Sequence, residues 1–276
     1  MRETKLCKNL ALEMHFVQMM KLHRESKKIT PFTIEISPND RITGFEVLPN
    51  GSQLTNALPI AILLHGYRSK ARRLAYAARS LVNHGYAVIM VNLRGHSRSE
   101  GNRSDVHGMQ NDLKHLVQYF QLKKYVDQSR IILIGWSLGA LLALTTGNQI
   151  PHITHLIALG AISSPADFFN GFNPLQRKIW KLRSKLGGMD IFSMTGLLRY
   201  NPSSQFIRKK LLLIHSKDDQ IVAVNNFWTN VAAFGLEKKD YFLLARGGHN
   251  YILAKNQVMN RILNWLENYC DLGSER

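Results

Sequence analysis

Short apolar runs recur along most of this chain and alternate with stretches that have a helical pattern. Before residue 59, alternating apolar and polar positions predict a two-stranded hairpin over Phe32–Ser37 and Ile42–Leu48. The later runs have no polar interruption, as in strands covered on both faces: Ile60–Leu64, Ala87–Val91, Ile131–Ile134, Leu156–Leu159, Leu211–Ile214 and Tyr241–Leu244. The alternation predicts an α/β protein with a mostly parallel central sheet of about eight strands flanked by helices.

The segments outside these runs suggest one domain with a lead-in and an insertion. Apolar residues from Val106 to Phe120, and again from Val258 to Tyr269, fall on one helical face. Residues 1–30 are basic and amphipathic and are predicted to form a helical lead-in, whereas residues 31–276 form the domain. The stretch of about 164–207 is longer than one crossover requires, so we expect a small helical cap there.

The pentapeptide Gly135-Trp136-Ser137-Leu138-Gly139 follows an apolar run and opens a helical pattern. A G-x-S-x-G sequence between a strand and a helix is typical of a nucleophile elbow. Its glycines permit a sharp turn around a strained serine, and the helix N-terminus behind that serine stabilises developing negative charge. Ser137 is therefore the predicted nucleophile, and hydrolytic acyl transfer is the predicted chemistry.

A serine hydroxyl needs a base to take its proton and a third group to orient that base. His249 is the predicted base, because the loop that holds it follows a late apolar run and precedes the last helix. The orienting acid is expected after the preceding strand, where Asp218 and Asp219 are adjacent. Only one of them can face His249, and either carboxylate could instead cap the helix that begins near Val222. Spacing alone does not choose between them.

The oxyanion hole requires backbone N–H groups directed at the carbonyl oxygen of the substrate. One is expected from Leu138, directly after the nucleophile, and the other from Tyr67, in the loop after an early strand. Gly66 permits the turn that directs the Tyr67 amide inward. His65 is interpreted as a structural residue that anchors this loop rather than as a second base. This chemistry implies no metal and no organic cofactor.

Charge is the unusual feature of the composition. The chain has 36 Lys and Arg against 19 Asp and Glu, a formal net charge of +17. Such a charge fits a solubilising surface, and equally an attraction to an anionic substrate or to an anionic membrane at its periphery. Nucleic acid is disfavoured as a partner, because the basic residues are dispersed and no recognition motif accompanies them.

Apolar runs, the N-terminal segment and the cysteines indicate where the protein is located and whether disulfides cross-link it. No apolar run is long enough for a transmembrane helix, and the N-terminal segment lacks the features of a signal peptide. Two cysteines, Cys7 and Cys270, do not make a disulfide framework. We therefore expect a cytoplasmic protein, and the sequence leaves its oligomeric state open.

Taken together, these elements resemble the α/β-hydrolase superfamily over roughly residues 32–270. The order of nucleophile, acid and histidine along the chain is the order of that superfamily. His215–Val222 resembles its H-G-x-x-D-x-x-V turn. That resemblance implies Asp219 as the acid of the triad, with Asp218 as the alternate.

A second loop supports the resemblance and departs from it at two positions. Leu93–Gly101 resembles the D-x-R-G-h-G-x-S-x-G loop of the superfamily, with Asn92 in place of the usual aspartate and Ser97 in place of a glycine. Both departures lie outside the triad. Within the superfamily, the layout is similar to serine hydrolases of the monoacylglycerol-lipase and serine-aminopeptidase-like kind.

The resemblance implies a serine hydrolase that cleaves carboxylic esters or thioesters through an acyl-enzyme. The cap would suit an acyl chain, although its aromatic residues would equally suit a cap core. Basic residues follow the oxyanion loop and recur in the cap: Arg68, Lys70, Arg72, Arg73, Lys178, Lys181, Arg183 and Lys185. If these side chains line the entrance to the site, they would favour an anionic, lipid-like substrate such as a lysophospholipid. Two alternatives stay open. One is a peptidase of the serine-aminopeptidase-like kind, and the other is a non-catalytic member that binds a ligand or partner.

Overall fold

The computed structural model describes residues 28–38, 40–51, 57–163, 209–251 and 254–270, and between them Phe168, Pro174, Leu175, Lys178 and Leu182. Eight strands in these residues form one sheet: β1 (Lys28–Ser37), β2 (Asp40–Leu48), β3 (Leu58–Leu64), β4 (Ala87–Val91), β5 (Val126–Trp136), β6 (His155–Leu159), β7 (Lys210–Ser216) and β8 (Tyr241–Leu244). The predicted mostly parallel sheet is confirmed: β2 runs antiparallel to β1 and β4, and all pairs from β4 to β8 are parallel.

The order of the strands fixes where the loops meet. The sheet runs β1-β2-β4-β3-β5-β6-β7-β8, so the chain leaves β3 toward one edge and leaves β5 toward the other. In an open α/β sheet, the crevice between two such strands, outside their carboxyl ends, is where ligands bind. The loop after β3 and the turn after β5 are the segments with the predicted oxyanion residues and nucleophile.

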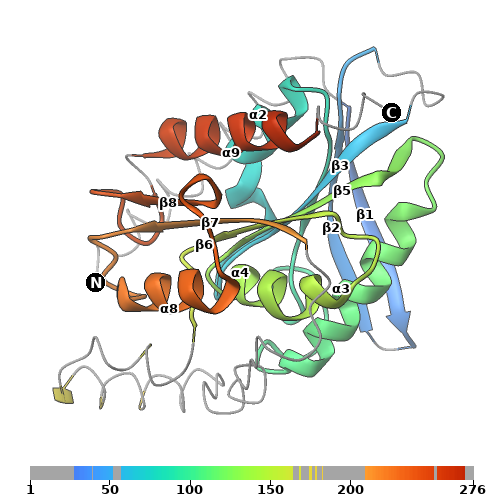
Figure 1. Ribbon diagram of the computed structural model, residues 1–276. Coiled ribbons are helices and arrows are strands. Elements are labelled where there is room, and N and C mark those ends of the chain that lie inside the picture. Colours follow the sequence, from blue (N-terminus) through green and yellow to red (C-terminus); the bar gives the residue numbers. More distant parts are fainter. Residues whose placement is uncertain are drawn as a thin grey trace, which may run out of the picture.

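Helices cover both faces of the sheet (Figure 1). Helices α2 (Ala75–Asn83) and α9 (Lys255–Cys270) pack on one face. Helices α3 (Val106–Gln121), α4 (Leu138–Leu142) and α8 (Asn225–Phe234) pack on the other. Successive residues of β3 enter opposite layers: Ile60, Ile62 and Leu64 join the α3 side, whereas Ala61 and Leu63 join the α2 side. This burial on both faces is why the strand has no polar positions.

The predicted helices are present, with shifted boundaries. The two apolar helical patterns form α3 and α9. Helix α8 begins at Asn225, slightly after the predicted start near Val222, and α2 was not among the predicted helices. Of the helices that the structure describes, none combines the length and the hydrophobicity needed to cross a bilayer.

Two predicted segments fall mostly outside the described residues. β1 begins at Lys28, so residues 28–30 of the predicted lead-in belong to the sheet rather than to a helix. The rest of that lead-in is outside the described part of the chain, as is the predicted cap of residues 164–207 except for the five positions named above.

Candidate active site

Ser137 occupies the sharp turn between β5 and α4. Its φ is 52° and its ψ is −110°, a conformation that residues with a side chain rarely adopt. The Ser137 N–H donates to the carbonyl of Leu159 at 2.9 Å, and the Ser137 carbonyl accepts from the N–H of Leu141 at 2.9 Å. Strand β6 and helix α4 thus hold the strained backbone from both sides, and the turn has the form that the elbow sequence predicts.

The glycines around Ser137 are required by close backbone contacts. A Cβ on Gly135 would lie 2.1 Å from the carbonyl oxygen of Gly139, and one on Gly139 would lie 2.4 Å from that of Leu64. Neither position has room for a side chain, since the atoms in the way are backbone atoms. A Cβ on Gly66 would lie 3.2 Å from the Ser137 Cβ. The loop after β3 therefore passes directly beside the nucleophile.

The His249 ring is bound to the carboxylate of Asp219. Nδ1 of His249 lies 2.8 Å from Oδ2 of Asp219, whose side chain is fully buried, while 15% of the His249 side chain is exposed. The other oxygen, Oδ1, accepts the N–H groups of Ile221 at 2.8 Å and Val222 at 2.9 Å. Because the carboxylate can only accept, Nδ1 carries a hydrogen, and in the neutral ring Nε2 then keeps its lone pair.

Asp218 has a different set of partners. Its Oδ1 accepts the N–H groups of Gly247 at 2.9 Å and Gly248 at 2.8 Å, and also the hydroxyl of Ser216. These hydrogen bonds, the one from Ser216 first, lower the pKa of the Asp218 carboxyl. Asp218 thus fixes the backbone of the loop that presents His249, whereas Asp219 contacts the ring itself.

Ser137 and His249 both lie beside the end of β6. Gly160 follows Leu159, the acceptor for the Ser137 N–H, and a Cβ on Gly160 would lie 3.4 Å from Cε1 of His249. Within the described part of the chain, no hydrogen bond joins the Ser137 hydroxyl to the His249 ring. Hydrogen bonds of this kind are commonly long without substrate and shorten when it binds.

The loop after β3 is anchored by His65, which is buried. Nε2 of His65 accepts the N–H of Leu93 at 3.1 Å, so Nδ1 carries the hydrogen and donates it to the carbonyl of Gly66 at 2.7 Å. Burial lowers the pKa of His65 to about 3, which keeps the ring neutral at physiological pH. This bonding agrees with a structural role and leaves neither ring nitrogen for a second base.

Acidification should weaken the fold through His65. Its pKa is about 3 in the folded protein and 6.5 for an unperturbed histidine, so the unfolded chain binds the proton first as the pH falls. The stabilisation is complete above the unfolded pKa and decreases by about 1.4 kcal/mol per pH unit below it, until the folded state is protonated near the lower pKa.

Urea denaturation between about pH 7 and pH 4 measures this effect. A His65→Gln variant has no proton to gain at this position, so its free energy of unfolding should fall less steeply than that of the wild type. The other buried histidines are common to both proteins and cancel in the comparison. Equal slopes would contradict the neutral state assigned to His65.

The loop after β4 contributes a side chain that the sequence did not single out. Nε2 of His96 accepts the N–H of Arg68 at 3.1 Å, and Nδ1 lies 2.8 Å from the carbonyl of Arg94. His96 therefore binds the segment that directly follows the predicted oxyanion residue. Its place within the R-G-h-G segment is the signal that sequence reasoning could have used.

The two departures from the superfamily pattern lie in the same loop. Asn92 is buried, accepts the N–H of Ala71 at 2.9 Å and donates to the hydroxyl of Thr43 at 3.1 Å. An ionised aspartate would accept only, so the amide suits this pair of partners. Ser97 has a φ of 56°, which lies in the left-handed region where the superfamily pattern has glycine.

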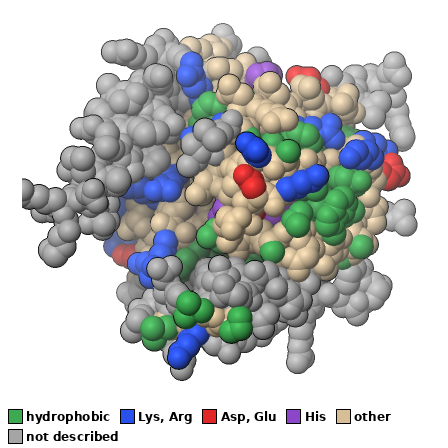
Figure 2. Space-filling model, turned by 90° about the vertical axis from the view of Figure 1, so that its left-hand side faces the viewer, with side chains coloured by type: hydrophobic (Ala, Val, Ile, Leu, Met, Phe, Trp, Pro, Cys, Tyr) green, Lys and Arg blue, Asp and Glu red, His purple; other side chains and the backbone are tan. Residues whose placement is uncertain are grey.

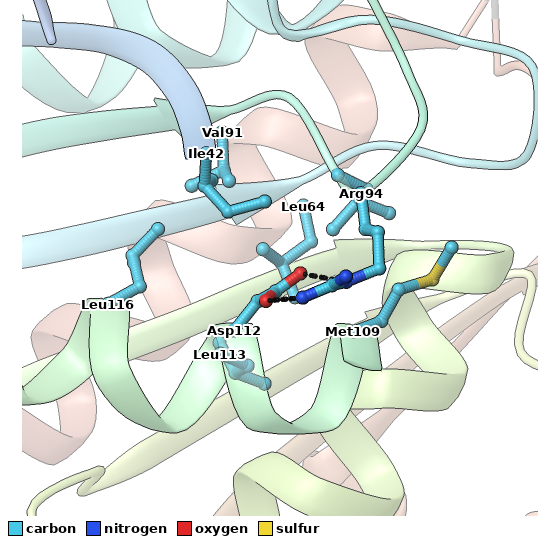
Figure 3. Close-up of a pocket in the computed structure, with 9 residues that line it drawn as sticks. Ile42, Leu64, Val91, Arg94, Met109, Asp112, Leu113 and Leu116 are labelled. Atoms are coloured by element: carbon cyan, nitrogen blue, oxygen red, sulfur yellow. Dashed lines mark hydrogen bonds and ion pairs between the residues drawn. The ribbon is translucent and has the colours of Figure 1, made fainter. Parts of the chain in front are cut away.

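A buried ion pair ties this loop to α3. The Arg94 guanidinium forms two hydrogen bonds to the Asp112 carboxylate, at 2.9 and 2.6 Å (Figure 3). Its third nitrogen lies 2.8 Å from Asp40. The small cavity beside the pair is lined by core residues such as Ile42 and Leu116 and by none of the predicted site residues. The Arg94–Asp112 ion pair therefore holds the loop after β4 against α3.

Comparisons with known proteins match parts of this chain to one family and to several proteins. Residues 55–189 match the family described as serine aminopeptidase, S33. The multifunctional-autoprocessing repeats-in-toxin of Vibrio cholerae serotype O1 is 34% identical over 124 residues, which are 39% of this chain and 3% of the toxin. An uncharacterized protein of Rickettsia prowazekii is 31% identical over 106 residues, 37% of this chain and 44% of that protein. The chain thus spans less than half of the length of these relatives.

Solved structures match over most of the chain. An esterase of Pyrococcus furiosus has a TM-score of 0.69 and 21% identity, with 89% of this chain and 92% of that chain covered. A serine hydrolase without a lid from Xanthomonas campestris has a TM-score of 0.63 and 17% identity, with 88% and 95% covered. Est1E of Butyrivibrio proteoclasticus with bound ferulic acid has a TM-score of 0.64 and 15% identity, with 86% of this chain and 98% of that chain covered. With its strand order and its elbow, the chain has the α/β-hydrolase fold, and its residues 55–189 match the family described as serine aminopeptidase, S33.

Proposed function

We propose that this protein hydrolyses carboxylic esters through an acyl-enzyme intermediate on Ser137. The observation that carries the proposal is the strained Ser137 turn beside the His249–Asp219 pair, at the carboxyl edge of the sheet. Because Nδ1–H of His249 is bound to Asp219, Nε2 is the nitrogen left to accept the serine proton.

The reaction follows from these positions. Ser137 Oγ attacks the carbonyl carbon of the ester while His249 Nε2 takes its proton, and Asp219 stabilises the imidazolium that forms. The N–H groups of Leu138 and Tyr67 bind the oxyanion of the tetrahedral intermediate. As this intermediate collapses, the C–O bond to the alcohol breaks and His249 gives its proton to the leaving oxygen. Water then attacks the acyl-enzyme with the same base, which releases the acid and restores Ser137.

An ester is favoured over an amide by the structural neighbours. The Pyrococcus furiosus neighbour is an esterase, and Est1E holds ferulic acid, a small carboxylic acid. The family description favours the second candidate, a peptidase of the serine-aminopeptidase kind. A thioester remains within the proposal, because the same acyl-enzyme forms with a thiol as leaving group.

We further propose that the substrate carries an anionic group. Exposed basic side chains lie on four loops that each follow the carboxyl end of a strand: Arg68, Arg98, Lys217 and Arg246. Among the described residues, none of these four forms an ion pair with a carboxylate. Strands β7 and β8 end at the left of Figure 1, and Figure 2 shows that face with more Lys and Arg than acidic side chains. Such a rim would attract a carboxylate or phosphate, as in a lysophospholipid or at an anionic membrane surface.

A fluorophosphonate probe tests the reaction class without knowledge of the substrate. Phosphonylation requires a serine activated by its base and a formed oxyanion hole, so we expect a single adduct on Ser137, located by peptide mass spectrometry. Heat-unfolded protein provides the control and should remain unlabelled. A folded protein without an adduct on Ser137 would contradict the proposed function and support a member that only binds a ligand.

Turnover then separates the substrate classes. Esters and thioesters of increasing acyl length should be cleaved faster than aminoacyl anilides, whereas turnover confined to the anilides would establish the peptidase. An ester with a terminal carboxylate should have a lower KM than a neutral ester of equal length. That advantage should shrink at high salt, because the rim is exposed and its charges are screened. Equal KM values would contradict the anionic substrate.

A further inference from the structure

Two neutral histidines outside the predicted triad hold the backbone on either side of Tyr67. We propose that His96, together with His65, positions the Tyr67 N–H for the oxyanion, so that His96 is a positioning residue for the reaction although it contacts no substrate. The inference rests on the proposed function, in which the Tyr67 N–H is one of the two oxyanion donors.

His65 fixes the peptide that precedes Tyr67. The Gly66 carbonyl and the Tyr67 N–H belong to one planar peptide and point in opposite directions. Nδ1–H of His65 donates to that carbonyl at 2.7 Å, and the Ser69 N–H donates to it at 3.1 Å. With the carbonyl held by two donors, the Tyr67 N–H is held in the opposite direction.

His96 fixes the peptide that follows Tyr67. The N–H of Arg68 belongs to this peptide and donates to Nε2 of His96 at 3.1 Å. Arg68 has a φ of 56°, a left-handed conformation that is unfavourable for a residue with a side chain. The hydrogen bond to His96 is an interaction that this strained conformation makes available. Both peptides that flank the Tyr67 Cα are thus bound by an imidazole.

Each ring can do this only in one neutral form. Nδ1 of His96 carries a hydrogen for the Arg94 carbonyl at 2.8 Å, which leaves the Nε2 lone pair for Arg68. Burial lowers the pKa of His96 as well as that of His65. The two rings meet edge to face with centroids 5.1 Å apart, and the Tyr67 ring meets His96 at 5.8 Å. The loops after β3 and β4 are therefore packed against each other at the oxyanion residue.

The loop that carries His96 is itself rigidly supported. Arg94 is held by the buried carboxylate of Asp112, and Asn92 binds the N–H of Ala71 (Figure 3 shows the first of these contacts). Oxyanion donors are effective because they need no reorganisation when negative charge develops. The His96 ring is bound to the Arg94 carbonyl through Nδ1 and to the Arg68 N–H through Nε2. It therefore connects the loop held by α3 to the peptide that follows Tyr67.

Two substitutions that differ by one methylene test the inference. Gln at position 96 can place its carbonyl oxygen near the place of Nε2 and accept from Arg68, whereas Asn is too short. We expect His96→Asn to lower kcat for an ester by about 10- to 100-fold, with KM changed by less than about threefold, because one oxyanion donor is worth about 10²–10³ in kcat. His96→Gln should restore kcat to within about fivefold of the wild type, since it regains the acceptor.

His155→Asn provides the control for loss of a buried histidine. His155 is a buried residue at the amino end of β6, remote from the loops of the site, and kcat of this variant should stay at the wild-type value. All variants are compared at a temperature where circular dichroism shows them folded. Equal losses in His96→Asn and His96→Gln, or an unchanged kcat in His96→Asn, would overturn the positioning role.

Failure of the inference is distinguishable from failure of the proposed function. A wild type that turns over no ester and takes no fluorophosphonate overturns the proposed function itself. Should His96→Asn fail to fold, the nitrogen-15 shifts of the His96 ring in the wild type decide instead. A neutral ring with its hydrogen on Nδ1 supports the inference, and a charged ring or a hydrogen on Nε2 overturns it.

Discussion

Replacement of Ser137 by Ala should lower kcat for a p-nitrophenyl ester by about 10⁴- to 10⁶-fold, since no acyl-enzyme can form without the hydroxyl. Fluorophosphonate labelling should disappear with it. The fold should persist, because Ala can adopt the strained conformation at φ 52° no less readily than Ser and leaves the backbone bonds to Leu159 and Leu141 intact. Steady-state kinetics and a thermal melt of the same preparation measure both effects.

A double substitution sharpens this prediction. If His249 acts by taking the proton of Ser137, its loss costs nothing further once Ser137 is absent. Ser137→Ala combined with His249→Ala should therefore be as slow as Ser137→Ala alone, within about threefold. An additional loss of tenfold or more would mean that His249 serves another step. Retention of more than a tenth of wild-type kcat in Ser137→Ala would exclude the acyl-enzyme on this residue.

The strands of the fold were predictable where local sequence determines them. Burial of β3 in both layers leaves an uninterrupted apolar run, which is visible without any partner. The start of β5 was missed because Asp127, Gln128 and Ser129 are polar, although they belong to the strand. The order of the strands was not predictable, because a pairing such as that of β2 with β4 joins residues far apart in the sequence.

In the candidate site, too, the residues that stand in local motifs were predictable, whereas contacts between distant residues were not. Ser137 and His249 stand in local motifs, and the structure brings their loops together. The resemblance of the acid turn to the superfamily motif implied Asp219, but the contacts that distinguish Asp219 from Asp218 are hydrogen bonds to residues 247–249, about thirty positions away. His96 was missed for a similar reason, since its partner Arg68 precedes it by 28 residues and the contact uses a backbone N–H.

The adjacent carboxylates give the second large prediction. Asp219→Asn should lower kcat by about 10⁴-fold. The amide oxygen of the substituted side chain would still accept from Ile221 and Val222, but its NH₂ group would face Nδ1 of His249 and favour the tautomer with the hydrogen on Nε2. That tautomer cannot take the serine proton. Asp218→Asn keeps an acceptor for the N–H groups of residues 247 and 248 and should change kcat by less than about tenfold.

The pair of variants is its own control. Both remove one negative charge, from neighbouring residues of the same turn, by the same chemical change. A difference of about three orders of magnitude in kcat between them cannot come from net charge or from long-range electrostatics, which are nearly equal for the two positions. The difference in kcat must then arise because only one of the two carboxylates contacts the His249 imidazole. The opposite order, with Asp218→Asn the slower variant, would transfer the role of orienting acid to Asp218.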